Sequence, residues 1–231
     1  LSSYASKTDI PTKVSQLEND SGYITENRDL SEYALKSLYG DTTINVGRKA
    51  DSTVGSYSTA EGYNTTASGS YSHAEGSNTT ASESYSHAEG SNTTASGESS
   101  HAEGSSTTAS GYFAHAEGDS TTASGMTSHA EGDGTEASGY FSHAEGTMTT
   151  ASGDFSHAEG EMTTANGNDS HVEGSNTIAN GESQHVQGKY NIADETSAFI
   201  IGNGRGDNAR SNAMKVDWSG NLEVAGDLKD G

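Results

Sequence analysis

The chain has 231 residues with a formal net charge of −22, 29 glycines and no cysteine. Leu, Ile, Val and Phe together number only 25, and residues 55–171 contain no Leu, Ile or Val. This composition excludes an ordinary globular core, a transmembrane helix and a thiolate metal site for that stretch, and it argues against nucleic acid and anionic membranes as partners. We therefore expect neither nucleic-acid binding nor membrane insertion.

Residues 1–44 are predicted to form an N-terminal linker with one short helix. Pro11 and the polar string Asn19–Gly22 are typical of extended, turn-rich chain. Within residues 29–39 the apolar side chains recur at helical spacing, and Gly40 marks a helix end. Because the sequence begins at Leu1 rather than Met, we expect it to be part of a longer protein.

Residues 45–198 carry a repeat of 14 residues. All nine histidines fall on one series with that spacing, from His73 to His185, and they open blocks of the form H-A-E-G-S-N-T-T-A-S-G-x-x-S. A fixed short period is typical of a solenoid. A coiled coil would also repeat every 14 residues, as two heptads, but it needs Leu or Ile in the columns spaced by seven. Here those columns are Ala and Gly, and each Gly inside a helix destabilises it by about 1 kcal/mol. We therefore predict an all-β fold, a parallel β-roll with two short strands per coil.

Alternation along the strands predicts which side chains face inward. Ser72, Ala74 and Gly76 share one side of the first strand, and Thr79 and Ala81 lie on the matching side of the second. All five residues are small, as the interior of a thin roll requires.

The outward side of the first strand is predicted to be the interface of a homo-oligomer. It carries an aromatic column beside the His and Glu columns, whereas Asn78, Thr80 and Ser82 on the second strand are predicted to face solvent. A roll this thin buries too little apolar surface to offset its ordering entropy, so we expect self-association through the aromatic face. The predicted interface residues are His73, Glu75, His87, Glu89, His101, Glu103, His115, Glu117, His129, Glu131, His143, Glu145, His157, Glu159, His171, Glu173, Tyr71, Tyr85, Phe113, Phe141 and Phe155.

Residues 199–231 are predicted to form a C-terminal β cap or neck. A short apolar strand opens the segment, and Met214, Val216 and Trp218 then alternate with polar residues. After a turn at Ser219–Asn221 the alternation resumes, which predicts a β-hairpin.

The repeat resembles a known family. The string Y-S-H-A-E-G at Tyr71–Gly76 and in its copies is similar to the N-S-V-A-I-G motif of YadA-like head repeats, and T-T-A-S-G matches the other strand of that family. The resemblance implies a left-handed parallel β-roll of 14-residue coils, as in trimeric autotransporter adhesins, and a homotrimer with the first strand toward the axis. His73 and Glu75 stand where the family has Val and Ile, in coil after coil.

The flanks resemble segments of other proteins. Residues 11–23 are similar to N-terminal linkers of phage tail-fibre and baseplate proteins, and residues 212–226 to segments that follow such repeats in phage and prophage tail proteins. We therefore predict a structural shaft of a phage or prophage tail fibre, carried on the virion and taking part in attachment to a host cell-surface glycan or protein. The alternative is the head of a bacterial trimeric surface adhesin that binds host glycans or matrix.

Three features invite other functions. The H-x-E columns offer zinc ligands or catalytic groups, but an active site is seldom copied nine times, so we predict a structural ladder, no enzyme, no metal and no cofactor. Arg205-Gly206-Asp207 matches the integrin-binding tripeptide, within an ordinary Gly/Asn turn. An ice-binding solenoid is a less favoured alternative, because adjacent threonines point to opposite sides and leave one outward Thr column.

The His and Glu columns also lead to an electrostatic expectation. Because an unpaired buried carboxylate is costly, each Glu is expected to hydrogen bond to an imidazole. Such pairing raises the pKa of His and lowers that of Glu, and stability is then expected to peak in mildly acidic buffer.

Overall fold

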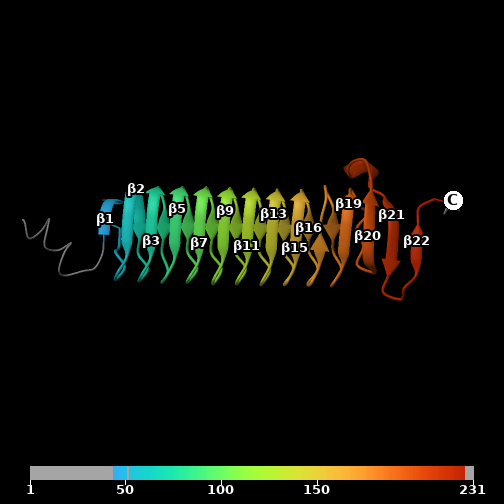
Figure 1. The fold of residues 1–231 in the computed structure, drawn as a ribbon, viewed down its shortest axis with the longest axis horizontal. Coiled ribbons are helices and arrows are strands. Elements are labelled where there is room, and N and C mark those ends of the chain that lie inside the picture. The colour runs from blue at the N-terminus through green and yellow to red at the C-terminus, as the bar shows by residue number, and fades with distance from the viewer. Residues whose placement is uncertain (1–43, 51, 227–231) are drawn as a thin grey trace, which may run out of the picture. The chain divides into compact units, whose positions relative to one another are not determined.

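The computed structural model describes residues 44–50 and 52–226, which form a parallel β-solenoid. Its strands lie side by side along the solenoid axis, coil after coil (Figure 1). The described residues contain no α-helix, as the all-β prediction requires. The helix predicted within residues 29–39, and the linker up to residue 43, lie outside the described residues.

Two parallel sheets run along the solenoid. The first, called the ladder sheet here, comprises β1 (Ile44–Arg48), the start of β2 (Thr59–Ala67), β3 (His73–Ser77), β5 (His87–Ser91), β7 (His101–Ser105), β9 (His115–Asp119), β11 (His129–Asp133), β13 (His143–Thr147), β15 (His157–Glu161), β17 (His171–Val172), β19 (His185–Lys189) and β20 (Ser197–Asn203). The second, called the short sheet, comprises the end of β2, β4 (Thr80–Ala81), β6 (Thr94–Ala95), β8 (Thr108–Ala109), β10 (Thr122–Ala123), β12 (Glu136–Ala137), β14 (Thr150–Ala151), β16 (Thr164–Ala165) and β18 (Ile178–Ala179).

In both sheets, each residue pairs with the equivalent residue of the next coil. His73 lies opposite His87 in the ladder sheet, and Thr80 lies opposite Thr94 in the short sheet. Each position of the repeat therefore becomes a continuous column of side chains along the axis.

The interior of the solenoid consists of the small residues that strand alternation predicts. Ala74 and Ala81 are fully buried, and so is Thr79. Ser72 is buried as well, and its hydroxyl donates a hydrogen bond of 2.7 Å to the carbonyl oxygen of Gly69. The two sheets thus approach closely enough that methyl and hydroxyl groups fill the space between them.

Gly76 departs from the predicted inward orientation. It is exposed, with φ of +108°, a conformation outside the range of L side chains. A Cβ atom built on Gly76 would lie 2.1 Å from the carbonyl oxygen of Gly90 in the next coil. The Gly column is therefore required by close backbone approach and positive φ rather than by the narrow interior.

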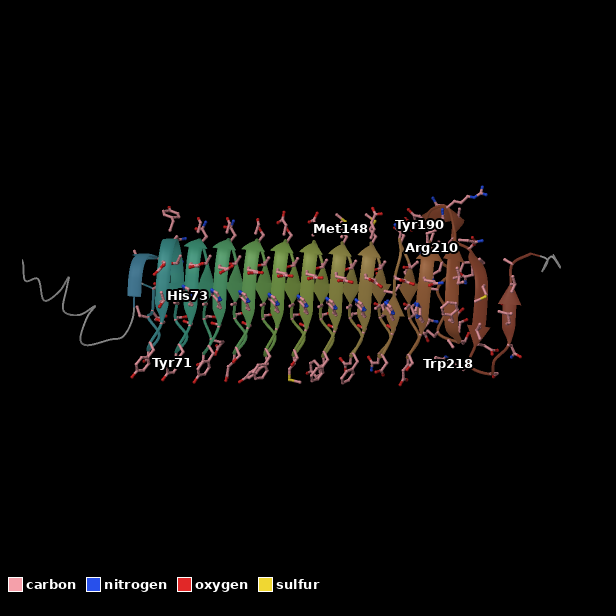
Figure 2. All side chains as sticks on the ribbon, viewed as in Figure 1. Tyr71, His73, Met148, Tyr190, Arg210 and Trp218 are labelled. Atoms are coloured by element: carbon pink, nitrogen blue, oxygen red, sulfur yellow. The ribbon has the colours of Figure 1, made fainter. Side chains whose placement is uncertain are left out.

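Two turn columns with positive φ connect the strands. Tyr71 precedes β3 with φ of 59°, and Asn78 follows it with φ of 56°. The labelled Tyr71 and Met148 mark the two columns at opposite edges of the solenoid (Figure 2). The prediction that Tyr71 shares a strand face with His73 was wrong, because the strand begins only at His73.

The C-terminal strands confirm the predicted hairpin. β20 pairs in parallel with β19, and β21 (Asn212–Asp217) and β22 (Leu222–Val224) then add antiparallel strands. Lys215 lies opposite Glu223, and their side chains approach to 3.1 Å. Trp218 lies in the turn rather than at the end of the strand, with an exposed side chain.

The side chain of Asn191 closes the C-terminal edge of the short sheet. β18 is the last strand of that sheet, so the backbone of Ile178 has no following strand to pair with. The Asn191 amide donates to the Ile178 carbonyl oxygen at 2.9 Å, and its own carbonyl oxygen accepts from the Ile178 N–H at 2.8 Å. Asn191 is fully buried, and it replaces the missing strand hydrogen bonds.

We predict that Asn191→Ala destabilises the end of the solenoid by roughly 2–4 kcal/mol, since two shielded backbone groups lose their partners. Hydrogen exchange at the Ile178 amide should accelerate along with a fall in the melting temperature. Asn203→Ala is the matched control, because the Asn203 side chain is exposed and accepts only from the hydroxyl of Ser211. Equal effects of the two substitutions would contradict the assigned role.

Candidate functional site

The outward face of the ladder sheet carries the His and Glu columns. Each ladder-sheet strand from β3 to β17 begins with His, and Glu follows two residues later on the same side. Both side chains are half-buried, as the pair His101 and Glu103 shows with exposed fractions of 36% and 33%. The structure therefore brings together the predicted histidines and glutamates, from His73 to Glu173, on one continuous face.

The imidazoles form a stack along the axis. Ring centroids from His73 to His171 lie 4.6–4.9 Å apart with nearly parallel planes. This spacing equals the distance between neighbouring strands of a sheet. His185 continues the stack with a tilted ring, and Phe199 ends it edge-on at 5.2 Å.

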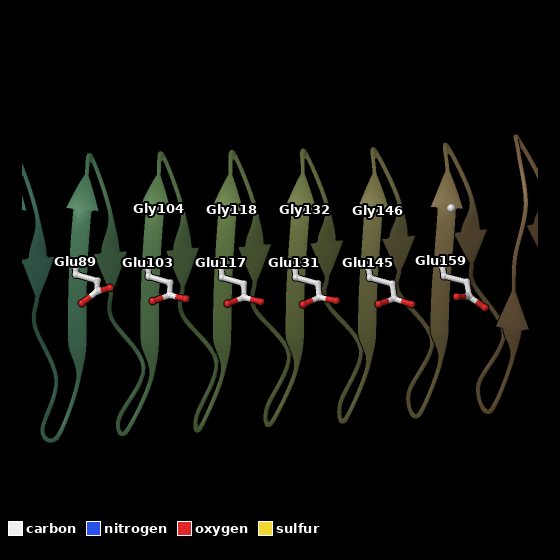
Figure 3. Close-up of a pocket in the computed structure, with 11 residues that line it drawn as sticks. Glu89, Glu103, Gly104, Glu117, Gly118, Glu131, Gly132, Glu145, Gly146 and Glu159 are labelled. Atoms are coloured by element: carbon white, nitrogen blue, oxygen red, sulfur yellow. The ribbon is translucent and has the colours of Figure 1, made fainter.

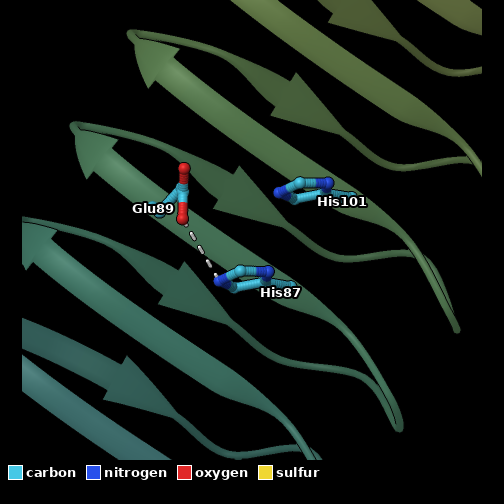
Figure 4. Close-up of side chains that lie close together, drawn as sticks. All are labelled: His87, Glu89 and His101. Carbon is cyan, nitrogen blue, oxygen red and sulfur yellow. Dashed lines mark ion pairs between the residues drawn. The ribbon is translucent and has the colours of Figure 1, made fainter.

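The glutamates lie within ion-pair distance of the imidazoles. His87 Nε2 lies 3.5 Å from Glu89 Oε2 of the same strand, as Figure 4 shows beside the parallel ring of His101. Toward the C-terminus the pairing changes to the preceding coil, and His171 Nε2 lies 3.2 Å from Glu159 Oε1. Of the described pairs only this last one meets the geometry of a hydrogen bond. The expectation that each Glu hydrogen bonds to an imidazole was therefore wrong within a single chain, where the side chains form loose pairs.

The carboxyl groups line a groove of about 810 Å³ together with the Gly column. Figure 3 shows six of them, from Glu89 to Glu159, in a row on successive strands. Hydrogen bonding with the neighbouring carboxyls raises the pKa of Glu117 and of Glu145 to about 7. The same hydrogen bonds lower the pKa of Glu131, which accepts from both. Equivalent carboxyls of the repeat therefore differ in pKa along the groove.

The pKa of several histidines shifts opposite to the expected direction. Burial within the stack lowers the pKa of His101, and the charges of the two adjacent imidazoles lower it further. The pKa values of His87, His129 and His157 are lowered for the same reasons. The expectation that each Glu raises the pKa of its His was wrong for these four residues, because desolvation and like charges outweigh the carboxylates.

The predicted aromatic column lies at the edge of the ladder face. Tyr71 stacks on Tyr85 with centroids 5.1 Å apart, and Phe141 stacks on Phe155 at 5.1 Å. These rings and Phe113 are exposed by 47–60%. These aromatic rings therefore do not lie among the imidazoles. They form a separate exposed stripe along one row of turns.

The Arg205-Gly206-Asp207 tripeptide lies in the loop between β20 and β21, next to the 3₁₀ helix η3 (Asp207–Ala209). The guanidinium of Arg210 donates to Asp207 Oδ1 at 2.6 Å and to the carbonyl oxygen of Asn176 at 2.8 Å. The Asp207 carboxylate therefore helps to hold the loop against the solenoid, as expected of a structural turn.

Sequence reasoning missed two buried side chains that terminate the solenoid. Gln184 replaces Ser in the interior column, and its amide donates to the carbonyl oxygens of Asp194 and Ser197. Asn191 replaces the buried Thr of the next column. The break in each column was the available signal, since a larger polar residue at a buried position needs its own hydrogen-bond partners.

A comparison with protein-family models found the YadA head domain repeat at residues 54–82, 88–114, 102–128 and 158–181. The matched coils are similar to YadA head domain repeats. The matched segments fall on the coils that bear the ladder face, which confirms the resemblance drawn from the motif. No curated protein matches the chain in sequence. Within the described residues, no helix is long and apolar enough to cross a membrane.

Proposed function

We propose that these YadA head repeats form the homotrimeric shaft of a phage or prophage tail fibre. In this role the solenoid is a rigid spacer on the virion and takes part in attachment to a host cell-surface glycan or protein. The proposal assigns no reaction, no nucleic acid and no membrane insertion to the segment. The repeats are adhesin-like. The family match therefore supports a second function equally, namely the head of a bacterial surface adhesin that binds host glycans or matrix.

The side chains of the single chain support self-association. Its interior holds almost only Ala, Ser, Thr and Gly, while Tyr and Phe stay exposed along the turns. The imidazole Nε2 atoms of His101, His115 and their neighbours are shielded from solvent yet have no hydrogen-bond partner among the described residues. Because burial of aromatic area stabilises proteins strongly, association of copies through the ladder face and its aromatic edge is the economical arrangement.

The proposal predicts that folding and assembly occur together. Light scattering should give a trimer, and dilution should reduce the mass and the β-sheet circular dichroism signal in parallel, because one chain alone lacks an aliphatic core. A well-folded monomer would rule out this proposal.

Two sets of substitutions test which face associates. Phe113, Phe141 and Phe155 changed together to Ser should shift the dissociation midpoint to at least tenfold higher concentration, because exposed aromatic area is removed. Thr80, Thr94 and Thr108 changed together to Ser serve as the control on the short sheet and should leave the midpoint within twofold. The reverse result would place the short sheet at the interface.

The two candidate functions differ in where the protein is found. An antibody against the solenoid should label tail fibres of virions released from the source bacterium, detected by immunogold electron microscopy. Labelling of the bacterial surface without labelled virions would favour the adhesin. A glycan array probed with the assembled protein then tests whether the aromatic edge takes part in attachment.

A further inference from the structure

We propose that the His and Glu columns of one chain bind divalent transition-metal ions, with Zn²⁺ as the best-suited ion. Each site would use imidazole Nε2 and carboxylate oxygens from adjacent coils. The proposal does not depend on the trimer, because all protein ligands of a site come from a single chain.

The ligand atoms already lie close together. Five sets of three side chains have their ligand atoms within 4.8 Å of one another. The sets are His87, Glu89 and His101; Glu103, His115 and Glu117; Glu117, His129 and Glu131; Glu131, His143 and Glu145; and Glu145, His157 and Glu159. In the central set His129 Nε2 lies 4.0 Å from Glu117 Oε1 and 3.9 Å from Glu131 Oε2.

These separations suit a tetrahedral ion. Ligands that bind Zn²⁺ at about 2.0–2.2 Å in a tetrahedron lie roughly 3.4 Å from one another. The His–Glu ion pairs within these sets span 3.5–4.0 Å, so the carboxylates have only a small distance to move. Three protein ligands leave a fourth position for water, and the exposed groove of the Glu column gives an ion a path to them.

The imidazoles have a coordinating atom that nothing in the chain occupies. Nε2 of His87, His101, His115, His129, His143 and His157 is shielded from solvent and has no hydrogen-bond partner among the described residues. A shielded polar atom without a partner is costly, and a metal ion would satisfy it. This separates the site from an ordinary cluster of surface acids, in which every oxygen is hydrated.

Electrostatics favour the same ligands. Zn²⁺ binds neutral imidazole and carboxylate oxygens, which are the two kinds of ligand that the His and Glu columns offer. The Glu column also places the carboxyl groups of successive coils side by side along the groove. A divalent cation bound between them would reduce the repulsion between neighbouring carboxylates.

Ligand sharing limits the number of ions. Neighbouring sets share Glu117, Glu131 or Glu145, and the set of His87, Glu89 and His101 shares none. At most three of the five sets can be filled without sharing a ligand, namely the unshared set and two of the four linked ones. We therefore expect about three tight Zn²⁺ ions per chain, spaced along the face.

The test is a titration of the full chain, stripped of metal by a chelator, with Zn²⁺ alone in isothermal calorimetry at pH 7.5. About three ions should bind per chain. Imidazole ¹⁵N signals should shift, since all nine histidines of the chain lie in the His column. Absence of imidazole shifts, or only weak binding without a defined stoichiometry, would overturn the proposal.

The discriminating variant is Glu117→Gln with Glu131→Gln. It removes a ligand from three of the five sets, so the stoichiometry should fall from about three to about two. Gln187 already occupies the Glu column in β19, which shows that the solenoid accommodates this side chain. Glu136→Gln is the control on the short sheet, and it should keep all three ions. An unchanged stoichiometry in the double variant would assign the ions to other carboxylates.

Light scattering of the metal-free and Zn²⁺-loaded chain separates this proposal from the proposed function. A monomer that binds Zn²⁺ through imidazoles would overturn the trimeric shaft and support the site. A trimer whose imidazoles ignore Zn²⁺ would support the shaft and overturn the site.

Discussion

Gly118→Ala is expected to lower the free energy of unfolding by at least about 3 kcal/mol, which corresponds to a fall in melting temperature of roughly 6–12 °C. The added Cβ would lie 2.1 Å from the carbonyl oxygen of Gly132, and φ of +109° adds backbone strain. The obstructing atom is backbone within a paired strand, so two coils would have to separate. Thermal unfolding followed by circular dichroism measures the effect.

Gly134→Ala is the matched control one coil later. Gly134 has φ of +65°, and a Cβ there would meet only Met148 Cγ at 3.6 Å. Other coils carry Asn in the same turn column, as at Asn78 and Asn92, so Gly134→Asn should cost almost nothing. The alanine variant should cost about 1 kcal/mol. Comparable losses for Gly118→Ala and Gly134→Ala would refute the close-approach argument.

Glu117→Gln with Glu145→Gln is expected to stabilise the protein at pH 8 and to change little at pH 5. The folded pKa of both carboxyls is raised to about 7 from 4.5, so their stabilising contribution is complete below pH 4.5 and is lost as pH rises through 7. The amide of Gln can donate the hydrogen bond of the protonated carboxyl at every pH. Allowing for solvent screening, we expect a gain of about 1–2 kcal/mol, or roughly 2–8 °C, at pH 8.

The histidines act in the opposite direction but in a different window. The folded pKa values of His87, His101, His129 and His157 are lowered, so these residues remove stability as pH falls through their unfolded pKa near 6.5. The wild-type protein and the double variant share these histidines, so the difference between their melting temperatures from pH 6.5 to pH 8 isolates the carboxyls. Over this range the wild-type protein should lose stability relative to the double variant. Glu136→Gln, which removes the same charge from the short sheet, should retain the wild-type slope.

Periodicity alone was enough to predict the coils and their interior. A single repeat contains few apolar residues, but alternation within it placed Ser72, Ala74, Thr79 and Ala81 correctly. Alternation failed two residues before the strand, at Tyr71, because a residue with positive φ no longer follows the strand pattern. Gly76 was misplaced for the same reason, since its columnar repetition reflects backbone contact between coils.

The sequence was enough to predict which residues form the candidate site, but not the direction of their pKa shifts. The shared spacing of His87 and Glu89 indicates that they lie on one face, and this was confirmed. The sequence does not show that His87 and His101 stack at 4.6 Å, and burial within this stack, followed by the charge of the adjacent imidazoles, lowers their pKa values. Asn191 lay beyond prediction because its role depends on where the short sheet ends.

Because each residue pairs with the equivalent residue of the next coil, recombination can change the length of the solenoid by whole coils without altering the strand pairing. Each ladder-sheet strand from β3 to β15 presents the same His-Ala-Glu-Gly edge to its neighbour, so a duplicated or deleted coil preserves the strand pairing at the junction. The residues that close the C-terminal end, Gln184, Asn191 and Arg210, all follow the array and would be carried along unaltered. Unequal crossing-over between coding repeats would therefore yield folded proteins of graded reach, whereas insertion of an odd number of residues within a strand would exchange the interior and exterior columns.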